Sequence, residues 1–72
     1  MKKIKKIKIK INGKFSTIND NLSLSNFLKG LKIPIKKVAI ELNQEIIDKN
    51  NLRTIKLKNN DKIEIVHFIG GG

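Results

Sequence analysis

The first residues of the chain alternate between apolar and charged positions. Ile7, Ile9 and Ile11 alternate with Lys8 and Lys10, which is the two-residue period of a β-strand with one buried face. Three isoleucines of the first eleven residues also fit the spacing of a basic amphipathic helix. Ile9 would fall outside the apolar stripe of that helix, and a series of β-branched residues favours a strand. The segment is therefore predicted to be a strand.

The dipeptide Asn12-Gly13 follows this strand directly. Asn and Gly are the two residue types that best tolerate positive φ, which both central positions of a type I′ turn require. The chain is therefore predicted to open with a β-hairpin, whose second strand covers about residues 14–18.

A polar run at residues 19–21 ends the second strand, and the next apolar residues have helical spacing. These residues are Leu24, Phe27, Leu28 and Leu31. Ser23 can cap the first turn of such a helix with its hydroxyl oxygen. Gly30 and Pro34 mark its end, because proline lacks the N–H that a continuing helix needs.

The second half of the chain returns to short apolar segments. Residues 38–42 alternate and predict a third strand. After it we expect a short apolar step at 46–47, a polar loop at 48–53, a brief extended piece at 55–57, a turn at 59–60 and a last strand at 62–69.

This order of elements predicts an α+β fold, in which one main helix packs on one face of a mixed sheet of four to five strands. A β-grasp arrangement fits the order, with the first and last strands parallel and side by side. It would make the last strand central and direct the C-terminus away from the sheet. We expect residues 1–69 to form a single domain and residues 70–72 to form a flexible glycine tail.

The formal net charge of +10 points to nucleic acid or to an anionic membrane surface. A competing explanation is the base composition of the genome, because Ile, Lys and Asn have adenine- and thymine-rich codons and make up more than half of the chain. Aromatic residues interleaved with the lysines, which would stack on bases, are missing. This absence argues against a dedicated nucleic-acid site.

The side-chain inventory argues against catalysis by this chain. It has no Cys, one His and six scattered acidic residues, so neither a thiol nucleophile, a serine hydrolase triad nor a metal centre is predicted. His67 shares its strand parity with Ile63 and Ile65, which predicts partial burial rather than a chemical role.

Targeting signals are also missing from the sequence. Lys8 and Lys10 interrupt the isoleucines, so the N-terminal segment lacks the apolar region of a signal peptide. No stretch approaches the roughly 18 apolar residues of a membrane span. A cytoplasmic protein without a membrane partner is the expectation.

Both faces of the last strand become apolar toward its end. Val66 and Phe68 lie on the face opposite Ile63 and Ile65, and only one face can meet the helix. Two interpretations follow. Either Phe68 folds over the rim of the core, or Val66 and Phe68 form a docking patch for a partner beside the tail.

The glycines at the end of the chain suggest a chemical role. Without Cβ atoms, Gly70 and Gly71 could thread a narrow tunnel into the active site of a partner and carry Gly72 there. Three residues extend at most about 10 Å. The Gly72 carboxylate is then the predicted reactive group, modified by partner enzymes.

Three segments carry a resemblance to a known family: Asn12-Gly13-Lys14, the strand at 38–43 and the run from Asp61 through Ile-Glu-Ile-Val-His-Phe-Ile to the three glycines. The chain resembles the small ubiquitin-like sulfur carriers of thiamine biosynthesis, the ThiS type, over nearly its whole length. It departs from that pattern at Asn60, where the family commonly has Gly, and in its lysine-rich N-terminus.

The resemblance implies a cycle of activation and sulfur transfer. A ThiF-type adenylating enzyme would use Mg-ATP to activate Gly72, and sulfur from a cysteine desulfurase or a similar donor would convert it to a thiocarboxylate. A ThiG-type thiazole synthase would consume the sulfur. The chain itself would be a cosubstrate rather than an enzyme, with no cofactor of its own.

Three other functions remain open on the sequence. Sulfur carriers for molybdopterin synthesis or for transfer-RNA thiolation share the fold and the glycine tail, although the Ile-Glu-Ile-Val-His-Phe-Ile run favours the thiamine branch. A small basic RNA-binding protein is the alternative from another class, motivated by the net charge.

Overall fold

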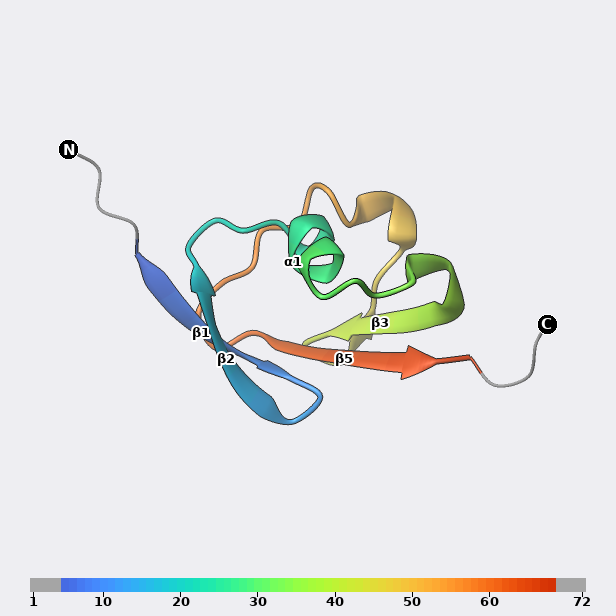
Figure 1. The fold of residues 1–72 in the computed structure, drawn as a ribbon, viewed down its shortest axis with the longest axis horizontal. Coiled ribbons are helices and arrows are strands. Elements are labelled where there is room, and N and C mark those ends of the chain that lie inside the picture. Colours follow the sequence, from blue (N-terminus) through green and yellow to red (C-terminus); the bar gives the residue numbers. More distant parts are fainter. Residues whose placement is uncertain (1–4, 69–72) are drawn as a thin grey trace.

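A five-stranded mixed sheet carries one α-helix across one face in the computed structural model, which describes residues 5–68 (Figure 1). The strand order is β2-β1-β5-β3-β4. The elements are β1 (Lys6–Ile11), β2 (Lys14–Asn19), α1 (Leu24–Gly30), the 3₁₀ helix η1 (Ile35–Lys37), β3 (Val38–Leu42), β4 (Glu45–Ile46), the 3₁₀ helix η2 (Lys49–Asn51) and β5 (Lys62–His67). The α+β prediction with a β-grasp arrangement is confirmed.

The N-terminal hairpin has the predicted turn. Asn12 and Gly13 both have positive φ, 47° and 84°, as a type I′ turn requires. The two strands pair antiparallel from Lys6↔Asn19 to Ile11↔Lys14. This register places the isoleucines of β1 on the face that meets the helix, where Ile9 is only 1% exposed.

β5 is the central strand and is paired on both sides, as predicted. It runs parallel to β1, with Lys10↔Lys62 and Ile11↔Ile63 as partners. On its other side it runs antiparallel to β3, from Leu42↔Ile63 to Val38↔His67. The two halves of the chain are therefore joined through β5.

Asn12 extends the short parallel pairing beyond the end of β1. Its N–H donates to the carbonyl of Ile63 (2.9 Å), and its side-chain Oδ1 accepts from the N–H of Ile65 (2.7 Å). One residue thus makes the hairpin turn and also takes the place of a further strand residue beside β5. The Asn12-Gly13 dipeptide predicts only the turn.

The predicted N-terminal cap of α1 is present. Ser23 Oγ accepts from the N–H of Asn26 at 3.1 Å, and Leu24, Phe27 and Leu28 are buried against the sheet. Leu31, the fourth apolar residue with helical spacing, is 48% exposed because the helix has ended before it.

The chain reverses after α1 at Lys32 and not at Gly30. Lys32 has a φ of 59°, and its N–H donates to Lys29 O while the N–H of Ile33 donates to Leu28 O. This pair of bonds is a Schellman motif, which needs a left-handed residue one position after the cap. A lysine in that position gave no signal in the sequence.

The core lies between α1 and the sheet and includes two leucines from irregular segments. Its buried residues are Ile9, Leu24, Phe27, Leu28, Val38, Ile40, Leu52, Leu57, Ile63 and Ile65. The prediction of a polar loop at 48–53 is wrong in this respect, since η2 turns the chain so that Leu52 is 5% exposed. The Leu52 carbonyl accepts from the N–H of Ser25 at 3.1 Å and ties this segment to the helix.

Side-chain hydrogen bonds fix the point at which β5 begins. Asn60 has a φ of 73°, which confirms the predicted turn. Asp61 Oδ2 accepts from the N–H of Lys58 (2.7 Å), and Asp61 Oδ1 accepts from Asn43 Nδ2 (3.0 Å). Asn43 Oδ1 in turn accepts from the N–H of Lys62 (2.9 Å). The start of β5 is thereby tied to the end of β3.

The Asn12 side chain can be tested by the substitution Asn12→Gly. Glycine keeps the positive φ but leaves the N–H of Ile65 without its acceptor, so we expect the free energy of unfolding to fall by about 1–3 kcal/mol. Urea denaturation measures this change. Asn21→Gly is the control, because Asn21 also has positive φ (64°) but lies in an exposed turn. Equal effects of the two substitutions would contradict the role of the Asn12 amide.

Candidate functional site

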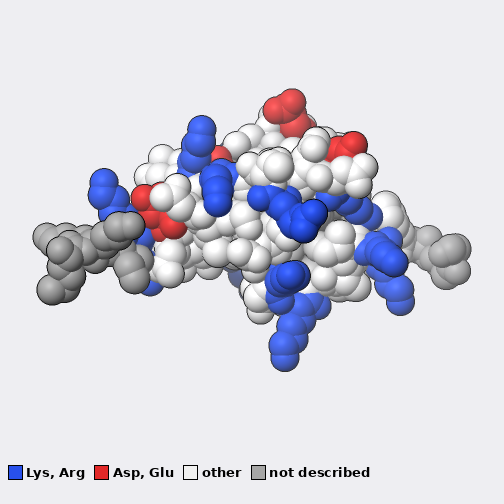
Figure 2. Space-filling view, turned by 90° about the horizontal axis from the view of Figure 1, so that it is seen from above, with Lys and Arg blue, Asp and Glu red and all other residues white. Residues whose placement is uncertain are grey.

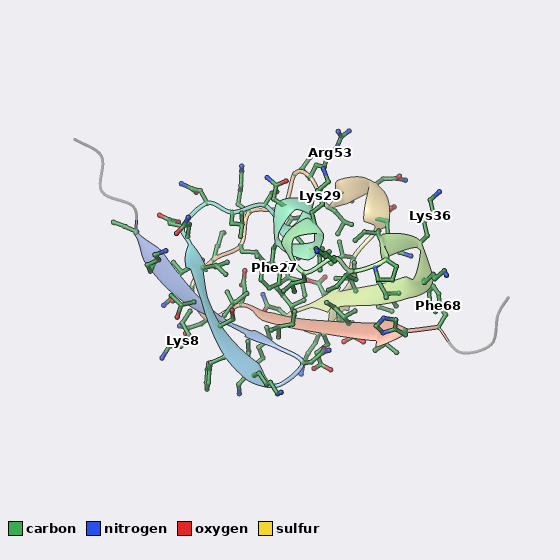
Figure 3. All side chains as sticks on the ribbon, viewed as in Figure 1. Lys8, Phe27, Lys29, Lys36, Arg53 and Phe68 are labelled. Carbon is green, nitrogen blue, oxygen red and sulfur yellow. The ribbon has the colours of Figure 1, made fainter. Side chains whose placement is uncertain are left out.

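The end of β5 is where the predicted functional residues meet. His67 is the last residue of the strand and pairs with Val38. The N–H of Phe68 then donates to the carbonyl of Lys37 at 3.0 Å. The backbone is therefore held through Phe68, the last described residue (Figure 3). Gly70, Gly71 and Gly72 lie outside the described residues.

Val66 and Phe68 are exposed, at 54% and 60%. Val66 lies on the sheet face opposite the helix, because its neighbour Ile65 is buried against the core. The ammonium of Lys49 stands 5.2 Å from the centroid of the Phe68 ring, within the range of a cation–π contact. Phe68 therefore does not fold into the core, and the docking interpretation stays a prediction.

Two further apolar residues lie on the same open face of the sheet. Ala39 pairs with Val66. Ile46, which is 77% exposed, pairs with Glu41, the next residue of β3 on that face after Ala39. Sequence reasoning missed Ile46, because β4 has only two residues and shows no alternation. We call Ala39, Ile46 and Val66 the tail-side patch; Phe68 lies beside this patch at the strand end, where its ring faces Lys49 of η2.

His67 is exposed, so the prediction of partial burial is wrong. Its parity is as expected, since it shares a face with Ile63 and Ile65. The helix lies over the middle of the sheet, however, and the end of β5 projects beyond it (Figure 1). Strand parity selects the face of a residue but not whether the helix reaches far enough to cover it.

This end of the sheet is suited to presenting the residues that follow β5 to another protein. The residues that the structure describes contain no group of three or more His, Asp or Glu side chains that could hold a metal ion. Among residues 5–68, no helix is long and apolar enough to cross a membrane. What the site does provide is an anchored strand end, with exposed apolar side chains beside it.

Comparisons with known proteins point to one family. The model of the ThiS family matches residues 9–72. The sulfur carrier protein ThiS of Bacillus subtilis is 37% identical over 65 residues, which cover 89% of this chain and 98% of that protein. A thiazole synthase of Magnetococcus marinus is 36% identical over 66 residues. The chain spans only 20% of the length of that enzyme.

A solved structure has the same fold. The crystal structure of a thiamine biosynthesis protein (ThiS) from Geobacter metallireducens superposes with a TM-score of 0.81 at 30% sequence identity. The superposition covers 92% of this chain and all of that one.

The surface position of Phe68 predicts that Phe68→Ala will change the free energy of unfolding by less than about 1 kcal/mol, which is the scale of an exposed cation–π contact. Phe27→Ala is the matched control, because Phe27 is 7% exposed in the core and its truncation should cost about 3–5 kcal/mol. Thermal or urea denaturation of both variants measures the difference. Similar losses would assign Phe68 to the core.

Proposed function

The chain belongs to the ThiS family, and we propose that it is a sulfur carrier of thiamine biosynthesis whose reactive group is the C-terminal carboxylate of Gly72. The observation that carries the proposal is the anchoring of β5. The strand is bonded on both sides, and Phe68 is held by the carbonyl of Lys37. The residues that follow therefore start from a fixed point at one end of the sheet.

Three glycines after this fixed point suit delivery into another protein. Together with Ile69, which lies between Phe68 and the glycines, they reach at most about 14 Å, so the carrier body must come close to the partner. Glycines also lack the Cβ atoms that would block a narrow tunnel. Gly70 and Gly71 are proposed to occupy such a tunnel, with Gly72 at the partner's active site.

Activation of the carboxylate would use Mg-ATP bound by a ThiF-type adenylating enzyme. An oxygen of the Gly72 carboxylate attacks the α-phosphorus of ATP, the bond to the β-phosphate breaks, and pyrophosphate leaves. The product is an acyl-adenylate. This step is needed because an oxide is a poor leaving group, whereas AMP is a good one.

Sulfur would then replace AMP. A persulfide sulfur, supplied through a cysteine desulfurase or a similar donor, attacks the acyl carbon, and the bond to AMP breaks. A second thiol attacks the resulting acyl disulfide, which leaves the Gly72 thiocarboxylate and a disulfide. In this scheme the carrier is a cosubstrate, and the catalytic groups belong to its partners.

A ThiG-type thiazole synthase is proposed as the partner that consumes the sulfur. Support comes from thiazole synthases that contain a segment similar to this chain, with 36% identity over 66 residues. Their carrier-like segment makes up 20% of each protein. A synthase that includes a carrier-like segment is consistent with direct contact between the two.

Val66 and Phe68 are proposed to dock on the partner beside the tunnel. Both are exposed next to the anchored strand end, and exposed aromatic side chains are typical anchors of protein interfaces. A contact at this point would also shorten the gap that the glycines must bridge.

Thiocarboxylation can be tested by intact-mass spectrometry. Incubation with the adenylating enzyme, Mg-ATP and a sulfur donor should shift the mass of the carrier by the exchange of one oxygen for one sulfur. A variant that lacks Gly72 should stay unchanged while keeping its fold. An unchanged wild-type mass, with a partner enzyme shown to be active on another carrier, would refute the proposal.

Phe68→Ala should raise the KM for the carrier in the adenylation reaction about tenfold or more, the scale of an interface anchor. The kcat should change little, because Phe68 does not touch the reacting atoms. Pyrophosphate release at varied carrier concentration measures both constants. Leu31→Ala is the control, since Leu31 is also an exposed apolar residue but lies at the end of α1. Equal KM values for the two variants would remove Phe68 from the docking surface.

A further inference from the structure

The open face of the sheet is divided into three zones that follow one another along β5. The basic zone holds Lys8, Lys10 and Lys62, the acidic zone holds Glu41 and Glu64, and the apolar zone is the tail-side patch. This order comes from the strand register, because Lys62, Glu64 and Val66 alternate with buried residues of β5. The direction from the basic to the apolar zone is also the direction toward the tail.

The basic zone is built around Phe15. Lys10 lies between Phe15 of β2 and Lys62 of β5 as the paired residue of both. The ammonium groups of Lys8 and Lys10 stand 5.3 and 5.0 Å from the centroid of the Phe15 ring, which is 69% exposed. These cation–π contacts hold two positive charges over one side chain.

A hollow of about 150 Å³ opens between these side chains. It is lined by Lys8, Ile9, Lys10, Phe15, Asn60 and Lys62. Three of the lining residues are lysines, and none is acidic. An anionic group placed there would relieve the repulsion among the lysines.

The acidic zone has an excess of negative charge, opposite in sign to the charge of the basic zone. Glu41 and Glu64 are directly opposite each other in the β3–β5 pairing, and like charges in this position destabilise a sheet. Neither zone is explained by the stability of the fold. Both suit a partner surface that presents the opposite charges in the same order.

We propose that the basic zone binds an acidic surface of the adenylating partner and that the three zones together orient the carrier with its tail toward the active site. This inference rests on the proposed function. Charges arranged in sequence fix the register of an interface and raise the rate of productive encounter more than they raise affinity. A carrier rotated by half a turn in the interface would place its basic zone against the part of the partner surface that matches the apolar zone.

Two observations favour a protein surface over single-stranded RNA as the ligand. Phe15 is the only aromatic residue among those that line the hollow, whereas proteins that bind single strands stack successive bases on several aromatic side chains. Glu64 and Glu41 also interrupt the basic surface within the same sheet face, which would repel a continuing phosphate backbone. A patch with both signs of charge fits a folded partner.

The test compares two triple variants of equal charge. The first variant changes Lys8, Lys10 and Lys62 to Glu. The second changes Lys29, Lys56 and Arg53 to Glu. Both lower the net charge from +10 to +4, because each exchange removes two charges. The control residues lie outside the open face: Lys29 and Arg53 point to the helix side, whereas Lys8 points away from it (Figure 3). The helix-side surface carries many other basic side chains as well (Figure 2).

The measured quantities are the KM and kcat of the carrier in adenylation by its ThiF-type enzyme with Mg-ATP, at low and at moderate salt. We expect the first variant to raise KM at least about tenfold at low salt, with kcat at saturation retained. The difference in KM between the two variants should become smaller at moderate salt, because the Debye length is only about 8 Å at physiological ionic strength and the charges are screened. The control variant should stay close to wild type.

Three other outcomes would contradict the inference or the proposed function. If both variants raise KM equally, the effect is one of net charge, and the inference is wrong. If KM is unchanged while a polyuridine oligonucleotide binds only with the three lysines present, the zone binds RNA instead. If wild-type protein is never adenylated, the proposed function fails before the zones are tested. Circular dichroism checks that each variant folds. If a Glu variant does not fold, both triple variants are made with Gln in place of Glu.

Discussion

The backbone pairing of β5 is the interaction on which the rest of this structure depends. It joins the N-terminal hairpin to β3 and β4, and it lines the core with Ile63 and Ile65. The parallel side of this pairing is short, with two residue pairs in the ladder. It is completed by the amide of Asn12 and by the bond from the N–H of Lys10 to the carbonyl of Asp61. The same pairing sets the direction in which the chain leaves the sheet.

The central place of β5 beside a parallel β1 followed from the order of elements, and the other features that the sequence predicted correctly are local. The alternation in β1, the Asn12-Gly13 turn and the Ser23 cap each depend on a few neighbouring residues. The features that it missed depend on distant parts of the chain. Leu52 is one apolar residue in a polar run, and only the packing of η2 against α1 shows that it belongs to the core. His67 has the right parity but lies beyond the reach of the helix.

The candidate site also has a part that the sequence could predict and a part that only the structure shows. The anchored strand end and the exposed Phe68 were within reach of sequence reasoning, because they belong to one segment. The order of charges on the open face was not, since it arises only when β1, β3 and β5 are placed in register. Core packing and the proposed recognition surface thus use opposite faces of the same strands. Ile65 is buried, and its neighbours Glu64 and Val66 are displayed.

The central position of β5 has a consequence for the synthesis of the protein. β5 is the last of the five strands to leave the ribosome, yet it lies in the middle of the sheet. Until it arrives, the hairpin and β3 have no common neighbour, and contacts between residues far apart in sequence form slowly. A nascent chain without β5 lacks a closed core and also lacks the middle strand of the open face. The core and the open face are therefore completed in the same step, by the strand that leads directly into the C-terminal segment.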